Sequence, residues 1–328
     1  MSRVLVVGGR GFMGRRVIRL LKQTLPDVEV LSGGRGSAND RVVDVRAPLP
    51  DALEGVDVLI NCVGPFDYDP RSLIEACVAG GVHYLDLAET AGWIAQASVS
   101  VGDTAIVPGC SSVPGLIQVF AQRWKDRPEI AKIRAQLSIG TNNPGSGTLL
   151  YSMLEPVGRR GWFRRSWLRE HGDLPARRYA NYPAGVDHVD LGGRSVPLEF
   201  GFGFDRRLYT SWLRLTAPLV GLTPRPLLKL QAWWMRLCSP LMRPFGSRIG
   251  ILSLDALGAD GLVFDSIEIR AAENGLDVPA WPSVWATEAI LSDGGRGART
   301  LADLVSAQTA EEKLLTAGYQ VRPASAQE

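Results

Sequence analysis

The chain has few of the residues that build metal sites and disulfide frameworks. Its 328 residues include four cysteines and three histidines, and no two cysteines form a Cys-x-x-Cys pair. Scattered thiols of this kind are typical of a reduced, cytosolic protein and argue against a structural zinc site or a disulfide scaffold. The segment Met1-Ser2-Arg3 runs directly into apolar residues and has no signal-peptide pattern. We therefore expect a cytoplasmic protein without a bound metal.

The chain also lacks a long apolar run, and one of its segments lacks acidic residues. No stretch approaches the roughly twenty uninterrupted apolar residues of a membrane-spanning helix. The net charge is only +2, yet residues 159–248 hold sixteen Arg and Lys against six Asp and Glu. Within that region, the segment Arg206–Arg248 has eight cations and no acid. Such asymmetry bears on binding partners rather than on the fold.

The strongest positive signal lies in residues 1–35. An apolar strand at Val4–Val7 leads into Gly9-x-Gly11-x-x-Gly14, which opens a segment with apolar residues at helical spacing. Glycines at this spacing allow a tight turn, close approach of the backbone to a pyrophosphate, and close packing of helix on strand. The helix N-terminus offers unpaired N–H groups to the phosphates. We therefore predict a dinucleotide site at Gly9, Gly11, Phe12, Met13 and Gly14.

A missing acid after the second strand indicates which dinucleotide binds. An NAD site usually places an acid there, about twenty residues after the glycines, to bind the ribose 2′-hydroxyl. Here the strand at 28–31 ends in Ser-Gly-Gly-Arg35. A guanidinium suits a phosphate because its planar fork can donate two hydrogen bonds. Arg35 therefore favours NADP(H), the alternative being a solvated loop cation. Asp44, in the next short strand at 42–45, is expected near the adenine.

Strand and helix patterns divide the chain into two domains. Strands alternate with helices in the first part, which predicts a Rossmann-like, doubly wound parallel sheet. Later strand-like runs lack crossover helices and predict a second α+β substrate domain with a mainly antiparallel sheet. We expect a dinucleotide-binding domain at 1–125, a substrate domain at 126–275, C-terminal helices at 276–322 that return to the first domain, and a disordered tail at 323–328.

Two segments carry a more specific pattern. Residues 57–66 read DVLINCVGPF, and residues 75–89 read EACVAGGVHYLDLAE. They resemble the NADP-binding domain of saccharopine dehydrogenase-like reductases, which typically have a VINxxGPF strand end and an AGxHYxDLxGE strand and loop. The loop here lacks the glycine expected before the glutamate. A Tyr-x-x-x-Lys pair, which a short-chain dehydrogenase needs, is absent. The resemblance covers the first 120 residues and hardly extends into the middle of the chain.

The resemblance implies a nicotinamide-dependent reductase, commonly acting on carbon–nitrogen bonds, with relatives proposed to reduce carbon–carbon double bonds in lipids. At the first matched strand end, Gly64 would let the backbone approach the cofactor. Phe66 would form a wall of the pocket, the alternative being a plain turn with a core aromatic. The cofactor-binding residues expected at this strand end are Asn61, Gly64, Pro65 and Phe66.

Candidate catalytic residues follow the predicted strands. Ligands of an open parallel sheet bind beyond the carboxyl ends of its strands. Hydride transfer is the chemistry of the cofactor, so the protein supplies orientation and sometimes a proton. We name Glu89, Asp86 and Cys110 as catalytic candidates. Asp86 has the alternative role of bracing its loop. Cys110 has the alternative role of a small packing residue, because no local partner would form its thiolate.

Neighbouring residues widen the set of candidates. Tyr84 and His83 are further proton donors, and strand alternation sends them to opposite faces of the sheet. Ser111 and Ser112 could hydrogen-bond the nicotinamide amide.

The tryptophan-rich segment 206–248 leaves three interpretations open. Its cations Lys229, Arg236 and Arg243 are spaced seven apart and would form one stripe on a continuous helix. Such a segment could lie in an anionic membrane interface. It could equally line the mouth of a pocket for a lipid-like or phosphate-bearing substrate, or pack internally with snorkelling cations. No nucleic-acid recognition motif accompanies the charge, so no nucleic-acid partner is expected.

Together, these patterns predict an NADPH-dependent reductase that transfers hydride to a C=N or C=C bond of a hydrophobic or anionic small molecule. We expect it to be cytoplasmic, with peripheral membrane contact through 206–248 as an option and a homo-oligomer as another. The alternative is a non-catalytic nucleotide-fold protein that acts at a membrane surface or as a scaffold.

Overall fold

The chain divides into two compact units. The computed structural model describes residues 1–47, 50–98, 103–143, 145–242 and 245–323. Unit 1 comprises Met1–Val119 and Asp277–Ser306, and unit 2 comprises Phe120–Leu276 and Ala307–Glu328. The last part of the chain is thus shared between the units, whereas the sequence analysis assigns all of 276–322 to the first domain. Residues 324–328 of the expected disordered tail lie outside the described residues.

Unit 1 is built on a parallel sheet with strand order β14-β6-β5-β4-β1-β2-β3. Every pairing among these strands is parallel, as the Rossmann-like prediction requires. The order reverses at β1, so the crevice between the ends of β1 and β4 is the topological switch point at which such sheets bind ligands. The strands are β1 (Arg3–Val7), β2 (Glu29–Gly34), β3 (Arg41–Val42), β4 (Val58–Asn61), β5 (His83–Asp86), β6 (Ala105–Val107) and β14 (Gly297–Ala298).

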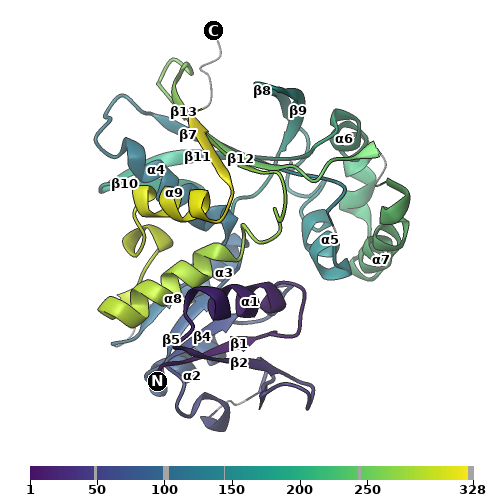
Figure 1. Ribbon diagram of the computed structural model, residues 1–328. Helices are drawn as coiled ribbons and strands as arrows, with labels where there is room; N and C mark the ends of the chain where they lie inside the picture. Colours follow the sequence, from purple (N-terminus) through teal and green to yellow (C-terminus); the bar gives the residue numbers. More distant parts are fainter. Residues whose placement is uncertain (48–49, 99–102, 144, 243–244, 324–328) are drawn as a thin grey trace. The chain divides into compact units, whose positions relative to one another are not determined.

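Helices cover both faces of this sheet, as Figure 1 shows for α1 and α8 on one face and α2 on the other. α1 buries Val17, Leu20 and Leu21 at the three- and four-residue spacing of one helical face. Arg19 forms an ion pair of 2.6 Å with Asp277, which precedes α8. The helices of unit 1 are α1 (Gly14–Thr24), η1 (Pro50–Leu53), α2 (Arg71–Ala79), α3 (Ala91–Ala97), η2 (Ser112–Leu116), α8 (Trp281–Asp293) and η5 (Leu301–Asp303).

One strand of unit 1 differs from the sequence prediction: the third strand is the short β3 rather than 42–45. The chain leaves unit 1 through three short helical segments, η2, α4 (Ile117–Ala121) and η3 (Gln122–Trp124). The η2 segment contains Val113 in an extended conformation, φ −128° and ψ 122°, which interrupts the regular helix.

Unit 2 contains a mixed sheet with strand order β15-β13-β12-β7-β11-β9-β8, and β10 pairs with β11. Only β7 and β11 pair in parallel among the described strands, so the sheet is mainly antiparallel, as predicted. The strands are β7 (Lys132–Ile139), β8 (Ser166–His171), β9 (Leu174–Asn181), β10 (His188–Leu191), β11 (Arg194–Phe204), β12 (Gly250–Leu257), β13 (Val263–Ala271) and β15 (Gln320–Pro323).

The helices of unit 2 lie in two places. α9 (Ala307–Thr316) packs on β15, the edge strand that follows it. At the other end, α6 (Arg207–Leu222) packs on β9 and β11, and α7 (Arg225–Met242) packs on α5 (Gly147–Leu154). Figure 1 shows α5, α6 and α7 gathered at one end of unit 2. None of the helices in the described part of the chain is long and apolar enough to cross a membrane.

Candidate functional site

The loop after β1 has no room for side chains at two glycines of the motif. A Cβ atom on Gly9 would lie 2.8 Å from the carbonyl oxygen of Val6, and one on Gly14 would lie 2.7 Å from the Cα of Gly9. Gly8, just before the motif, has φ of +78°, a left-handed conformation that favours glycine. A loop of this composition presents backbone rather than side chains to a ligand.

Helix α1 begins at this loop with an open N-terminus. Met13 occupies the N-cap position without a side-chain cap hydrogen bond, and the first turn contains no acid. The guanidinium of Arg16 donates to the Phe12 carbonyl at 2.7 Å and lies 4.0 Å from the centre of the Phe12 ring, which holds the loop on the helix. Unpaired N–H groups at the positive end of a helix dipole suit a phosphate anion.

Two arginines lie at the loop after β2, one within it and one that reaches it from the glycine motif. Arg35 follows β2 directly and is exposed. Arg10, from inside the glycine motif, donates to the carbonyl oxygen of Ala38 at 2.9 Å and so reaches the same loop. The sequence analysis did not identify Arg10. A signal was present, because in such folds the glycine motif lies next to the end of the second strand, where the ribose is expected.

An acid also reaches the end of β2, from the loop rather than from the strand. The backbone N–H and the hydroxyl of Ser32 both donate to Oδ2 of Asp40 at 2.8 Å. These two hydrogen bonds lower the pKa of Asp40, and the bond from the Ser32 backbone has the larger effect. Asp44, the expected neighbour of the adenine, is half-buried and accepts the N–H of Arg46 at 3.1 Å. Its contact with the adenine stays a prediction.

Asn61 braces the end of β4. It is completely buried, and its amide nitrogen donates to the hydroxyls of Tyr68 at 2.9 Å and Tyr84 at 3.2 Å. Its amide oxygen accepts the N–H of Val63 at 3.1 Å. The side chain is therefore hydrogen-bonded within the protein, and the expected contact of Asn61 with the cofactor stays a prediction.

The residues after Val63 form an aromatic wall. Gly64 is exposed, and Pro65 and Phe66 are half-buried. The ring of Phe66 meets Trp93 edge to face with centroids 4.9 Å apart, and Tyr68 meets the same indole at 4.7 Å. Phe66 therefore packs against the core aromatic Trp93 and stays partly accessible, and its role as a wall of the cofactor pocket stays a prediction.

Asp86 is the shared acceptor of the buried hydrogen bonds behind this wall. Its carboxylate accepts four hydrogen bonds, from the Tyr84 hydroxyl at 2.9 Å, the Trp93 indole at 2.7 Å, and the backbone N–H groups of Ala88 at 2.9 Å and Gly109 at 2.8 Å. Burial raises the pKa of Asp86, and the hydrogen bonds oppose that shift. Enclosed on these sides, Asp86 joins the ends of β5 and β6 to α3, as the bracing alternative predicts.

Three other candidates for catalysis do not have the surroundings that the role requires. Cys110 is completely buried and donates to the Val107 carbonyl, and burial raises the pKa of its thiol. A thiol that resists ionisation is a poor nucleophile, so these surroundings favour the alternative of a packing residue for Cys110, and its catalytic role stays an untested prediction. Tyr84 is likewise buried. His83 lies at the start of β5, the opposite end of the strand, where its Nδ1 accepts the N–H of Ala105 at 2.9 Å.

Glu89 is the catalytic candidate that keeps access to solvent. It lies in the loop between β5 and α3 and is exposed. Protein around the carboxyl displaces bulk water, which raises the pKa of Glu89 to about 7, against the opposing effect of a hydrogen bond from Ser111. The Ser111 hydroxyl lies 3.4 Å from Oε1 of Glu89. Glu89 can therefore hold and release a proton near neutral pH.

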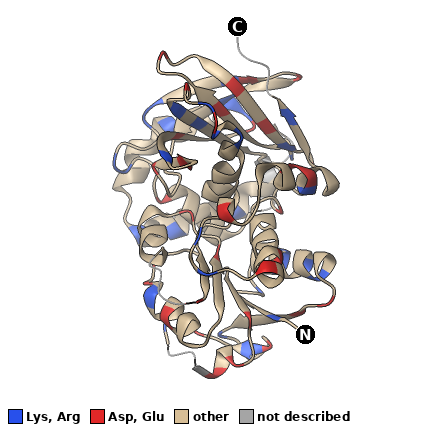
Figure 2. Cartoon of the chain, turned by 90° about the vertical axis from the view of Figure 1, so that its left-hand side faces the viewer, with Lys and Arg blue, Asp and Glu red and all other residues tan. Residues whose placement is uncertain are grey.

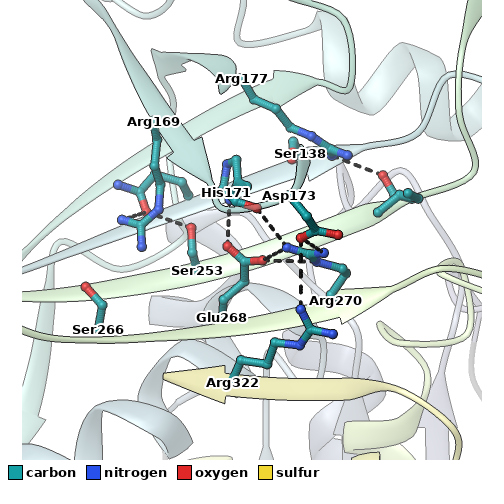
Figure 3. Close-up of polar contacts among 12 residues, drawn as sticks. Ser138, Arg169, His171, Asp173, Arg177, Ser253, Ser266, Glu268, Arg270 and Arg322 are labelled. Carbon is teal, nitrogen blue, oxygen red and sulfur yellow. Dashed lines mark hydrogen bonds and ion pairs between the residues drawn. The ribbon is translucent and has the colours of Figure 1, made fainter. Parts of the chain in front are cut away.

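Unit 2 contains a buried polar cluster that the sequence analysis missed (Figure 3). Nδ1 of His171 lies 2.6 Å from Glu268, and its Nε2 lies 2.8 Å from the hydroxyl of Tyr179. Arg169 pairs with Asp255 from across the sheet. Burial lowers the pKa of His171, opposed by its bond to Glu268. Further members are Gln136, Ser138, Arg177, Ser253, Ser266 and Arg270.

This cluster binds β8 and β9 to the rest of the sheet. The signal for it was the alternation of polar residues along β12 and β13, such as Ser266, Glu268 and Arg270, which places them on one face. Figure 2 shows basic and acidic segments on neighbouring strands of this sheet. The members are buried and pair with one another, so the cluster stabilises the fold. Among the described residues, no group of three His, Cys, Asp or Glu side chains could hold a metal ion.

The comparison with protein families identifies the first unit. Residues 4–105 match the family model described as the saccharopine dehydrogenase NADP binding domain. The match includes the glycine loop and both segments that carry the resemblance seen in the sequence. Unit 1 therefore contains an NADP-binding domain of the saccharopine dehydrogenase type, the cofactor module of an oxidoreductase, and the prediction of NADP(H) is confirmed.

Other comparisons concern the whole chain. No curated protein matches it in sequence. Among solved structures, DAP dehydrogenase from C. glutamicum in complex with DAP is 15% identical over 96% of this chain and 95% of that chain, with a TM-score of 0.48. An engineered D-amino acid dehydrogenase bound to NADP⁺ is 15% identical over 96% of this chain and 95% of that chain, with a TM-score of 0.46. UDP-N-acetylglucosamine 4-epimerase from Bacillus cereus is 18% identical, and the alignment spans 28% of this chain and 40% of that chain with a TM-score of 0.24.

Proposed function

We propose that the protein is an NADPH-dependent reductase that transfers hydride to a C=N or C=C bond of a small molecule. The observation that supports this most directly is the pairing of an NADP-binding domain with Glu89, an accessible carboxyl whose pKa is raised to about 7. Glu89 lies after β5, at the sheet edge where ligands of such sheets bind.

The cofactor would lie along the strand ends of unit 1. The N–H groups of the glycine loop and of the start of α1, from Gly9 to Gly14, would hold the pyrophosphate. Arg35, together with Arg10, would bind the 2′-phosphate, because two guanidinium groups reach the loop after β2. Asp44 would lie beside the adenine. The segment 64–66 would border the nicotinamide half.

The proposed reaction needs one hydride and one proton. NADPH, when bound, supplies the hydride to the electrophilic carbon of the double bond. Glu89 would give its proton to the nitrogen of an imine, or to the second carbon of an enoyl group, and would then take a proton from water. Ser111 would orient the carboxyl, and Asp86 would hold the loop that bears Glu89 in place.

For the substrate, we propose a hydrophobic or anionic molecule. The aromatic wall of Phe66, Tyr68 and Trp93 favours an apolar contact near the nicotinamide. The basic character of segment 206–248 favours an anionic or lipid-like partner and contact with a membrane surface. A cytoplasmic location and a homo-oligomeric state remain part of this proposal.

Turnover separates this reductase from a non-catalytic nucleotide-fold protein. Purified protein would be assayed for NADPH oxidation with panels of cyclic imines, enoyl compounds and ketones, with product identified by mass spectrometry. We expect reduction of at least one imine or enoyl compound, and loss of that activity in Glu89→Gln with NADPH affinity unchanged. NADPH binding without turnover on any panel would favour the non-catalytic alternative. Turnover that is unaffected by Glu89→Gln would remove Glu89 from the mechanism.

A further inference from the structure

Helix α6 has two apolar faces, of which one packs against the sheet of unit 2 and the other is exposed. Thr210, Leu213, Ala217 and Val220 are buried on the side that packs on β9 and β11. A second set of apolar residues follows a spacing of four and three residues, which places it on a single face of the helix. These residues are 57% to 82% exposed: Leu208, Trp212, Leu215, Leu219 and Leu222.

Helix α7 repeats this arrangement. Leu228 and Ala232 are completely buried on the side toward the rest of unit 2. Its outward apolar residues are 51% to 56% exposed: Leu227, Leu230, Trp233, Trp234 and Leu237. Exposed large side chains scattered singly are ordinary, but two adjacent helices with ten of them exceed what a free surface usually carries. These ten residues are called the α6–α7 surface below.

The charges around this surface have one sign. Segment 206–248 contains no acid, and Arg214 and Arg236 are exposed on the two helices. Arg214 donates to the carbonyl oxygen of Arg164 at 3.0 Å, which brings a further basic loop to α6. Arg225 lies 3.6 Å from Glu155, the residue that follows α5. Of the cationic stripe expected on α7, Lys229 lies over the ring of Tyr151 on α5, 5.3 Å from its centre, Arg236 is exposed, and Arg243 lies outside the described residues.

This charge pattern discriminates between occupants of the surface. A second copy of the chain would bring the same cations against one another, with no acids on either helix to form the interhelical salt bridges that usually set such pairings. An anionic bilayer complements the cations, and tryptophan is favoured at the level of lipid headgroups. Because neither helix is apolar enough to span a membrane, each would lie in the interface plane.

We propose that the α6–α7 surface docks the protein on the surface of an anionic lipid bilayer. The leucines would enter the acyl boundary, and Trp212, Trp233 and Trp234 would lie at the headgroups. This deepens the membrane contact included in the proposed function. Lipid binding is measured without turnover, so failure of the docking proposal leaves the reductase proposal standing, and the reverse also holds.

The test is co-sedimentation of the full chain with vesicles of equimolar phosphatidylcholine and phosphatidylglycerol, and with vesicles of phosphatidylcholine alone. We expect binding to the anionic vesicles, a blue shift of tryptophan emission, and weaker binding at high salt. The variant Leu215→Ser/Leu219→Ser/Leu237→Ser should bind the anionic vesicles at least about tenfold more weakly, because it removes three apolar side chains from the interface. All three side chains are exposed, so the variant should keep its circular dichroism spectrum.

The matched control is Leu262→Ser/Phe264→Ser. These residues are also exposed, at 67% and 54%, but lie at the start of β13, away from α6 and α7 in the sequence. The control variant should bind as the unmodified protein does. Absence of binding to anionic vesicles, or equal binding by the triple variant, would overturn the proposal. So would a dimer in analytical ultracentrifugation that the triple variant dissociates while vesicles stay unbound, since the surface would then belong to a second copy.

Discussion

Asp86→Ala would remove the acceptor of four hydrogen bonds from a completely buried site. The Tyr84 oxygen still accepts the amide N–H of Asn61 at 3.2 Å, but an amide nitrogen cannot accept the hydroxyl proton of Tyr84 in turn. The Tyr84 O–H, the indole N–H of Trp93 and the backbone N–H groups of Ala88 and Gly109 have no replacement acceptor among the contacts of the described residues. These four donors would be left buried and unpaired.

The magnitude follows from those donors. An unpaired buried donor costs about 1–3 kcal/mol, so four cost about 4–12 kcal/mol. Part of this is offset because the substitution also relieves the desolvation that raises the pKa of Asp86. We expect a net loss of about 3–5 kcal/mol in the free energy of unfolding of unit 1, a large fraction of the stability of a typical domain.

The assay is urea unfolding, followed by the fluorescence of tryptophans and by circular dichroism. Asp86→Ala should lower the unfolding midpoint strongly without changing the slope of the transition. Thr90→Ala, four residues further on, is the matched control; Thr90 is exposed and makes no side-chain cap hydrogen bond, so its loss should change stability by less than about 0.5 kcal/mol. A loss below about 1 kcal/mol for Asp86→Ala would refute the bracing role.

Four further outcomes are expected. Because the raised pKa of Glu89 keeps its carboxyl protonated below a pH of about 7, kcat should fall as the pH rises through that value. Glu89→Gln should lower kcat by about 10²–10⁴ and abolish this pH dependence. A pH profile of kcat that Glu89→Gln leaves unchanged would contradict the assignment. Arg35→Ala should weaken NADPH binding about tenfold in calorimetry and leave NADH binding as it is, whereas an equal loss for both cofactors would count against a 2′-phosphate contact. Gly14→Ala, whose Cβ would lie 2.7 Å from the Cα of Gly9, should lower the thermal midpoint and prevent NADPH binding, and wild-type affinity would show that the loop can relax. Arg169→Ala removes the cation that pairs with the buried Asp255 carboxylate and leaves this carboxylate with hydrogen bonds from Gln136 and Ser266. It should cost about 3–5 kcal/mol in chemical unfolding, and a neutral result would mean that these hydrogen bonds are enough to hold the buried carboxylate without Arg169.

The parts of the fold that could be predicted depend on local physics. The glycine loop can be predicted from the sequence because one turn and one helix start impose the spacing of its glycines. Gly9 and Gly14 indeed have no space for a Cβ atom. The alternation of strands and helices can be predicted because buried residues recur every two residues in a strand and every 3.6 residues in a helix. The same logic identified the antiparallel strands β12 and β13 of unit 2.

The sequence does not show which contacts the candidate site residues make inside the protein. Asn61, Asp86 and Cys110 all lie at or just after strand ends, and each is buried and hydrogen-bonded within the protein. Glu89 differs only in lying a few residues further into the loop, where it keeps contact with water. Arg10 was missed because its neighbour, the carbonyl of Ala38, lies in a loop that the sequence pattern does not place.

The sequence by itself determined the cofactor, the order of strands and helices, and the basic, apolar composition of segment 206–248, because these depend on residue identity and short-range periodicity. Only the tertiary structure decided which apolar stripe of α6 meets the sheet and which remains exposed. Both stripes have helical spacing, and the exposed stripe has the larger apolar side chains, so the sequence pattern alone would assign the wrong stripe to the core. Leu213 is buried and Leu215 is exposed because the side of α6 that bears Leu213 packs on β9 and β11, a contact set by the distant pairing of strands.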